Sequence, residues 1–163
     1  MPMTKLSLSL VAIFALTASC IAQTGHEPKN VTELYGKHLL KVVRNPDSVY
    51  AVLLDDNMGR LRERTKRILL SPEESQAASM RLTRNTAYGW DVWKPCLPQY
   101  GSRLIFQRGV DRVTVDFCFN CIILSVTPSA REEHDVDFGP SRKTWLQLFK
   151  TEFSKDKILS KVE

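Results

Sequence analysis

The sequence predicts an α+β fold: a small antiparallel sheet with a central hairpin, packed on one face by two or three helices. Residues 103–126 (RLIFQRGVDRVTVDFCFNCIILSV) alternate apolar and polar positions around a glycine turn, which is typical of a β-hairpin. Residues 31–44 and 141–153 instead space their apolar side chains as amphipathic helices do. Ser71-Pro72-Glu73-Glu74 is a third helix start, because serine caps and proline suits the first helical position.

The first segment of the 163-residue chain has the layout of a secretory signal. Lys5 precedes an apolar run at residues 6–16, and small residues follow. The run is too short to span a bilayer, which takes about 20 residues. We therefore expect a signal peptide at residues 1–22, a polar tether at 23–30 and a single α+β domain at 31–163.

Two cleavage sites fit this signal. Leu16-Thr17-Ala18-Ser19-Cys20 resembles the bacterial lipobox, with threonine where leucine is usual, and makes Cys20 the predicted lipidation site. Cys20-Ile21-Ala22 would instead serve ordinary secretion. Both sites place the protein in the bacterial cell envelope, either anchored to the membrane through a lipid or free in the periplasm. A lipid anchor would make the membrane its partner.

No nucleic-acid partner is predicted, although the chain is basic. Without Lys5, 22 basic residues stand against 18 acidic ones, and the net charge is +4. The basic run at residues 60–67 could bind nucleic acid, but a solvated loop or helix face is the simpler interpretation. Export also removes nucleic acid as an obvious partner.

The first half of the domain is predicted from local signals. Asn30 is a candidate cap for the helix at 31–44, and Asn45-Pro46 ends it. Residues 48–55 (SVYAVLLD) predict a strand, because they are rich in β-branched and aromatic side chains. A turn is expected at 55–59 and a short strand at 67–70.

The second half follows the same logic. The helix that starts at Ser71 should run to about residue 84, and residues 85–98 are irregular. After the hairpin, residues 127–140 predict a polar, acidic loop. The aromatic-faced helix at 141–153 follows, and a short last helix is expected at 154–162.

The second arm of the hairpin changes its hydrophobic phase near Asn120. Such a flip usually marks a bulge or bend, which we place at Phe119-Asn120, between Cys118 and Cys121. In an unbroken strand, residues three apart lie about 10 Å apart on opposite faces. A disulfide requires Cα atoms within about 7 Å. The break would therefore allow the two cysteines to act together.

Three cysteines, Cys96, Cys118 and Cys121, form the candidate chemical centre. A structural disulfide is the leading interpretation, with Cys118–Cys121 and Cys96 with either partner all open. Zinc is the alternative cofactor: these thiolates would be three ligands, and His134, an aspartate or water the fourth. Thiol-redox chemistry and a role as small buried apolar residues are further alternatives.

No catalytic constellation is predicted elsewhere. His26, His38 and His134 are scattered, and the 7 glycines form no phosphate-binding loop. We therefore expect a non-catalytic cell-envelope (lipo)protein with a three-cysteine structural centre. The alternative is a metal-binding or thiol-redox protein that uses Cys96, Cys118 and Cys121.

A resemblance supports this expectation. In one group of small bacterial proteins, often secreted or lipid-anchored, a Lys-x-Cys segment precedes a hairpin ending in Cys-Phe-x-Cys, and a Leu-x-x-Leu-x-x-x-Phe-Pro helix follows. From about residue 39 onward this chain is similar to them, with Ser154 where proline is usual. The matching segments are Asn45-Pro46-Asp47-Ser48-Val49, Trp90, Lys94-x-Cys96, Phe106, Cys118-Phe119-x-Cys121, Trp145-x-x-Leu148 and Glu152-Phe153-Ser154. The resemblance implies the architecture and the three-cysteine centre, and it implies no activity.

Overall fold

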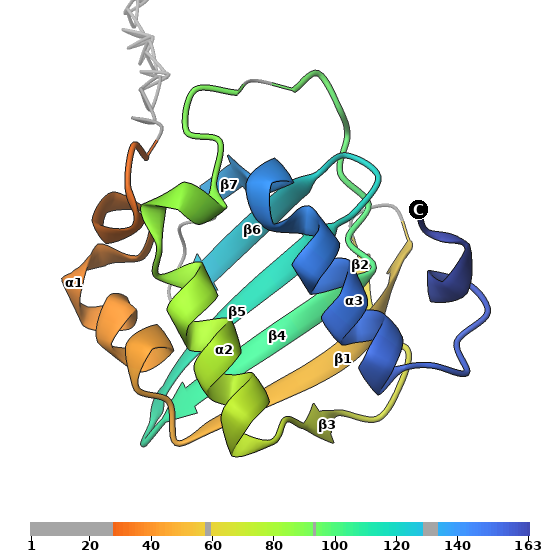
Figure 1. Cartoon of the computed structure of the whole chain (residues 1–163), viewed down its shortest axis with the longest axis horizontal. Coiled ribbons are helices and arrows are strands. Elements are labelled where there is room, and N and C mark those ends of the chain that lie inside the picture. The colour runs from red at the N-terminus through yellow and green to blue at the C-terminus, as the bar shows by residue number, and fades with distance from the viewer. Residues whose placement is uncertain (1–27, 58–59, 93, 129–133) are drawn as a thin grey trace, which may run out of the picture.

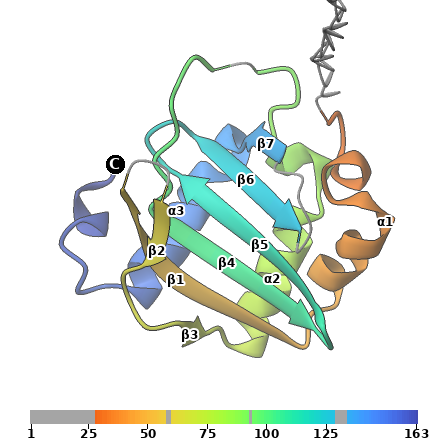
Figure 2. The same ribbon diagram turned by 180° about the vertical axis from the view of Figure 1, so that it is seen from behind.

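In the computed structural model, the described helices gather on one face of a single sheet, and none of them covers the other face (Figures 1 and 2). The structure describes residues 28–57, 60–92, 94–128 and 134–163. The α+β prediction is confirmed. The predicted signal peptide, Cys20 and tether residues 23–27 lie outside the described residues.

The sheet is built from seven antiparallel strands in the order β2-β1-β4-β5-β6-β7, with β3 pairing β1 beside this path. The strands are β1 (Ser48–Asn57), β2 (Arg60–Glu63), β3 (Ile68–Leu69), β4 (Ser102–Arg108), β5 (Asp111–Cys118), β6 (Ile123–Pro128) and β7 (His134–Asp137). The helices are α1 (Val31–Arg44), α2 (Pro72–Leu82) and α3 (Arg142–Glu152), with 3-10 turns η1 (Asn85–Ala87), η2 (Gly139–Ser141) and η3 (Leu159–Lys161).

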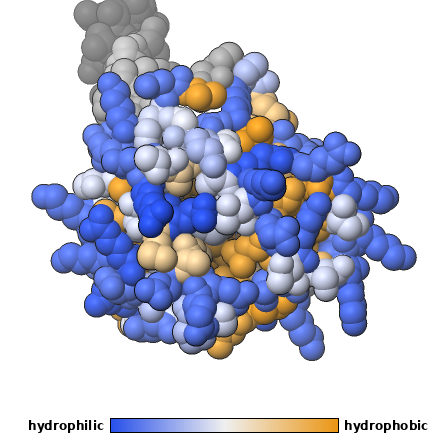
Figure 3. Space-filling model, viewed as in Figure 1, coloured by the Kyte–Doolittle hydropathy of each residue, from blue (hydrophilic) through white to orange (hydrophobic). Residues whose placement is uncertain are grey.

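The core lies between the sheet and the helices. Alternate residues of the central strands point into it, because side chains alternate faces along a strand. Phe117 of β5 lies at its centre, with ring centroids of Trp145 and Phe149 from α3 at 5.3 and 5.5 Å. The outer surface on the helix side is mostly hydrophilic, with small apolar areas between charged side chains (Figure 3).

Two helix starts confirm the capping predictions. The Asn30 side chain accepts hydrogen bonds from the N–H groups of Thr32 and Glu33, which lack partners within the helix. Ser71 and Glu74 form a reciprocal capping box at the start of α2. The helix α1 contains one departure from helical geometry, because Gly36 has a φ of +66°.

The prediction for the second arm of the hairpin is wrong in one respect. The chain reverses completely after Cys118, and β5 and β6 pair with Cys118 opposite Ile123. Residues 119–122 form the turn, so the break lies where the sequence placed it but is not a bulge. The reversal explains the change of phase, because Phe117 and Leu124 face the same core from neighbouring strands.

Four further predictions differ from the structure. Residues 55–57 continue β1 instead of turning, and the basic run begins as the edge strand β2, where a loop or helix face was expected. The acidic segment contains β7, which pairs with β6. Only a 3-10 turn, η3, forms in the last segment. Among the described ranges, no helix is both long and apolar enough to cross a membrane.

Candidate functional site

The structure brings the three predicted cysteines together at the turn between β5 and β6. Cys96 and Cys121 form a disulfide with a Cα–Cα distance of 6.0 Å and a sequence separation of 25. The bond ties the irregular segment that precedes β4 to the turn. Cys118 keeps a free thiol and is 1% exposed. The pairing that the sequence left open is therefore Cys96 with Cys121.

Cys118 is fixed by backbone groups on both sides of the disulfide. Its sulfur accepts hydrogen bonds from the N–H of Gln99 at 3.3 Å and of Cys121 at 3.4 Å. Ile123 and Tyr100 pack around it. The thiol therefore lies against the same turn that carries one half of the disulfide.

A lysine and an aspartate hold this turn in place. Lys94 donates to the carbonyl of Ile122 and forms an ion pair with Asp137. Ile122 has a φ of +58°, a left-handed conformation that a β-branched residue rarely adopts. Gly89 and Gly139 make room for the Asp137 carboxylate, because a Cβ on either would lie within about 3 Å of its Oδ1. Lys94 and Asp137 also line a pocket of about 250 Å3 beside Cys96.

The predicted zinc site has too few thiolates in this state. Zinc in structural sites takes four ligands, and the disulfide occupies two of the three sulfurs. Within the described part of the chain, no group of three or more His, Cys, Asp or Glu side chains is placed to hold a metal ion. Zinc binding would require reduction of Cys96–Cys121, and for the reduced protein it stays a prediction.

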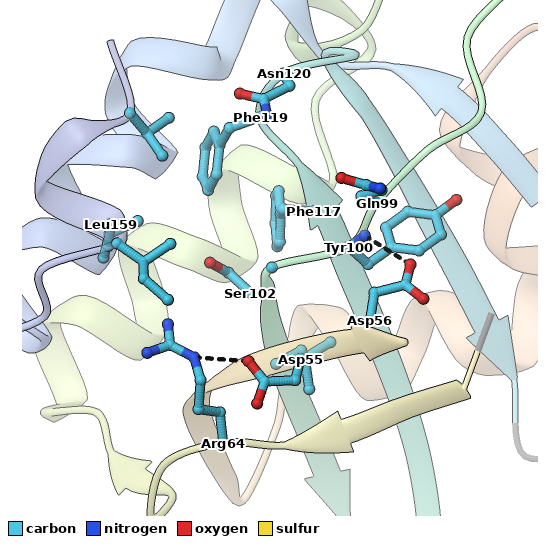
Figure 4. A pocket seen from close by; sticks show the side chains of 14 residues that line it. Asp55, Asp56, Arg64, Gln99, Tyr100, Ser102, Phe117, Phe119, Asn120 and Leu159 are labelled. Atoms are coloured by element: carbon cyan, nitrogen blue, oxygen red, sulfur yellow. Dashed lines mark hydrogen bonds and ion pairs between the residues drawn. The ribbon is translucent and has the colours of Figure 1, made fainter. Parts of the chain in front are cut away.

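A second pocket, which the sequence did not predict, opens at one end of the sheet (Figure 4). It has a volume of about 210 Å3 and lies where β1 ends, β4 begins and β5 ends, with the segment around η3 as its outer wall. Phe117 and Phe119 line its apolar part, together with Leu159. Its polar lining includes Asp55, Asp56, Arg64, Gln99, Ser102 and Asn120.

Arg64 connects this pocket to the C-terminal segment. Its Nη1 and Nη2 donate to the two carboxylate oxygens of Asp156 at 2.5 and 3.2 Å. Its Nε lies 3.1 Å from Oδ1 of Asp55, an ion pair that lacks hydrogen-bond geometry. The hydrogen bonds from Arg64 hold the pKa of Asp156 below its usual value, because they stabilise the charged carboxylate. The pair therefore fastens the wall of the pocket to the sheet.

The described histidines, His38 and His134, line neither pocket. His38 Nε2 lies 3.1 Å from Oδ2 of Asp111, at the opposite end of β5 from Cys118. His134 begins β7. His26 and Cys20 lie outside the described residues. No motif marked the second pocket, because Arg64 and Asp156 are 92 residues apart in the sequence.

Known proteins give no further guide to this site. No family model, curated protein or solved structure matches the chain.

Proposed function

We propose that this chain is an exported, non-catalytic domain of the bacterial cell envelope, stabilised by its three-cysteine centre and tethered through the segment before α1. The observation that carries the proposal is the Cys96–Cys121 disulfide. Disulfides persist in oxidising compartments such as the periplasm and are rare in the cytosol. The signal-like residues 1–22 point to the same compartment.

The disulfide has a clear structural purpose in this proposal. The segment between η1 and β4 contains no helix or paired strand in its described residues, apart from the bridge of Gly89 to Asp137. Its backbone ties are few and include the N–H of Gln99, which donates to a sulfur. The Cys96–Cys121 disulfide therefore holds this segment to the sheet, as backbone hydrogen bonds hold other parts of the chain.

The test combines location with a thiol count. Cell fractions that express the full chain should show it processed and in the envelope, and a Cys20→Ser variant should lose lipid labelling and membrane partitioning. Unreduced, denatured mature protein should show the two-dalton deficit of one disulfide, with Cys118 as the domain's alkylated cysteine. Cytosolic protein with all three thiols reduced would contradict the proposal.

A second candidate, thiol–disulfide exchange, follows from the position of Cys118. As a thiolate it would attack Sγ of Cys121, forming Cys118–Cys121 and releasing Cys96 as a thiolate. No external oxidant is consumed, because one disulfide replaces another. Cys96 is exposed and could then react with a partner thiol or disulfide.

Alkylation of the native protein separates the two candidates. A purely structural disulfide leaves Cys118 buried and unreactive, so peptide mapping should find no labelled Cys96. Exchange predicts gradual labelling of Cys96 with a new Cys118–Cys121 bond. The Cys118→Ala variant is the control, since it keeps the disulfide and removes the attacking sulfur. Native mass spectrometry of the reduced protein with zinc tests the metal-binding alternative.

A further inference from the structure

We infer that the pocket at the end of β1, β4 and β5 binds a small organic cation: an amine carried on an apolar or aromatic body. The inference is independent of export, because it depends only on the lining of the pocket. Three features carry it: a buried hydroxyl without a partner, an aromatic wall, and an excess of carboxylates.

The hydroxyl is that of Ser102. The residue is 1% exposed, and its Oγ has no hydrogen-bond partner among the described residues. In Figure 4 this oxygen is directed toward the space between Phe119 and Leu159, which both line the pocket. A buried hydroxyl left unpaired costs free energy, and the Ser102 hydroxyl is one that lies beside an open pocket. A ligand in the pocket would supply the missing partner.

The apolar part of the pocket matches an aromatic or branched aliphatic group. Phe117 and Phe119 lie with ring centroids 6.0 Å apart and interplanar angle 12°, and Leu159 faces them from η3. The volume of about 210 Å3 exceeds the roughly 150 Å3 that accommodates benzene in an apolar cavity. A single ring with a short chain therefore fits, and a large cofactor does not.

The charged part of the lining favours a cation. Asp55 and Asp56 are its acidic members, and Arg64 is its basic one. The guanidinium of Arg64 already faces Asp156 through both terminal nitrogens and Asp55 through Nε. Asp55 and Asp156 already neutralise this guanidinium, so an anionic ligand would have to compete with two carboxylates for it. Asp55, with its side chain 62% exposed, remains open to a second positive group.

The probe is 2-phenylethylamine, added to the full chain. Titration followed by amide NMR should shift the signals of Gly101, Ser102 and Asn120, which line the pocket. Two matched compounds keep the ring and change the head group: neutral 2-phenylethanol and anionic 3-phenylpropanoate. We expect calorimetry to find the amine at least about tenfold tighter than either, since a charge-assisted hydrogen bond is the stronger kind. Equal or tighter binding of the alcohol or the acid would overturn the inference, as would shifts confined to another region.

The variant Ser102→Ala tests the hydroxyl itself. It should weaken amine binding about tenfold and leave stability unchanged or slightly raised, because no hydrogen bond of the free protein is lost. Ser79→Ala is the matched control: its hydroxyl is also buried and unpartnered, but it lies on α2 and does not line the pocket. Asp55→Asn should weaken binding of the amine and leave 2-phenylethanol unaffected. Equal effects of the two serine variants on affinity would contradict a role for Ser102.

Discussion

Arg103 and Asp116 lie directly opposite each other on β4 and β5 and form a bidentate ion pair. Because the neighbouring Phe117 faces the core, the two side chains lie on the other face of the sheet, which no described helix covers. Figure 2 shows the sheet from behind. Nε and Nη2 of the arginine donate to the two carboxylate oxygens at 2.5 and 2.7 Å. Asp116 is 2% exposed, and this burial raises its pKa despite the hydrogen bonds from Arg103. Tyr100 lies over the same face and donates to Asp135 at 3.0 Å.

Removing one member of this pair should be costly. The variant Arg103→Met leaves a buried carboxylate without its partner, and we expect the free energy of unfolding at pH 7 to fall by about 3 kcal/mol. A raised carboxyl pKa means that the folded state holds its proton to higher pH. The loss should therefore grow as pH rises through the folded pKa of Asp116 and shrink in acid.

Urea denaturation across this pH range measures the effect. The double variant Arg103→Met, Asp116→Leu should recover most of the lost stability, because it removes both charges together. Exposed Arg60→Met is the control for loss of an arginine. A loss below about 0.5 kcal/mol in the single variant would show that the pair is energetically unimportant.

The pair between Arg64 and Asp156 predicts a loss of stability in acid. The pKa of Asp156 is lowered from 3.8, chiefly by the hydrogen bonds from Arg64. Its contribution to stability is therefore complete above the unfolded pKa and is lost as pH falls through the lower folded pKa. Asp156→Asn should lose about 2 kcal/mol at neutral pH and show a shallower decline in acid than the wild type.

Thermal unfolding of both proteins between pH 7 and pH 2 tests this prediction. Asp91→Asn, which changes an exposed aspartate, serves as the control. Parallel pH profiles for Asp156→Asn and the wild type would show that the ion pair does not cause acid sensitivity.

A third prediction concerns Gly36 in α1. Helix propensity alone predicts that alanine would stabilise this position by about 1 kcal/mol. Because Gly36 has a φ of +66°, we expect Gly36→Ala to destabilise the protein by about that amount instead. Gly101→Ala is the control, since its φ is not left-handed and a Cβ there meets open space. A stabilising effect of Gly36→Ala would mean that the kink is unnecessary for packing.

The parts of the fold that the sequence predicted are those with local signals. Asn30 and Ser71 cap helices through groups two or three residues away, and these contacts are fixed by the sequence spacing. The alternation of Leu104 and Phe106 likewise reports which side of one strand faces the main core. The fold class, the helix bounds and the main strands were predicted from such short-range rules.

The turn between β5 and β6 lacks such a signal. Its residues 119–122 include no glycine or proline, and Ile122 takes up a left-handed conformation that its own side chain disfavours. The turn is held by Lys94 and by the disulfide, which come from distant parts of the chain. The sequence therefore located a break but could not distinguish a reversal from a bulge. The pocket with Ser102 was missed for the same reason, since its walls come from five separate segments.

The last prediction separates the two kinds of cysteine in the centre. Cys121→Ser breaks a disulfide that closes a loop with a sequence separation of 25. By loop-closure entropy we expect the free energy of unfolding to fall by about 3.5 kcal/mol under non-reducing conditions. Reduction of the wild type should lower its stability toward that of Cys121→Ser, because both then lack the same crosslink.

The matched control is Cys118→Ala, which keeps the crosslink and removes a buried sulfur that accepts two backbone N–H groups. It should cost about 1 to 2 kcal/mol, with an equal loss before and after reduction of Cys96–Cys121. Urea denaturation of the wild type and of Cys118→Ala, each with and without a reductant, measures the four stabilities to be compared. If reduction destabilised the Cys118→Ala protein no further, the crosslink would not be what holds the segment before β4 to the sheet.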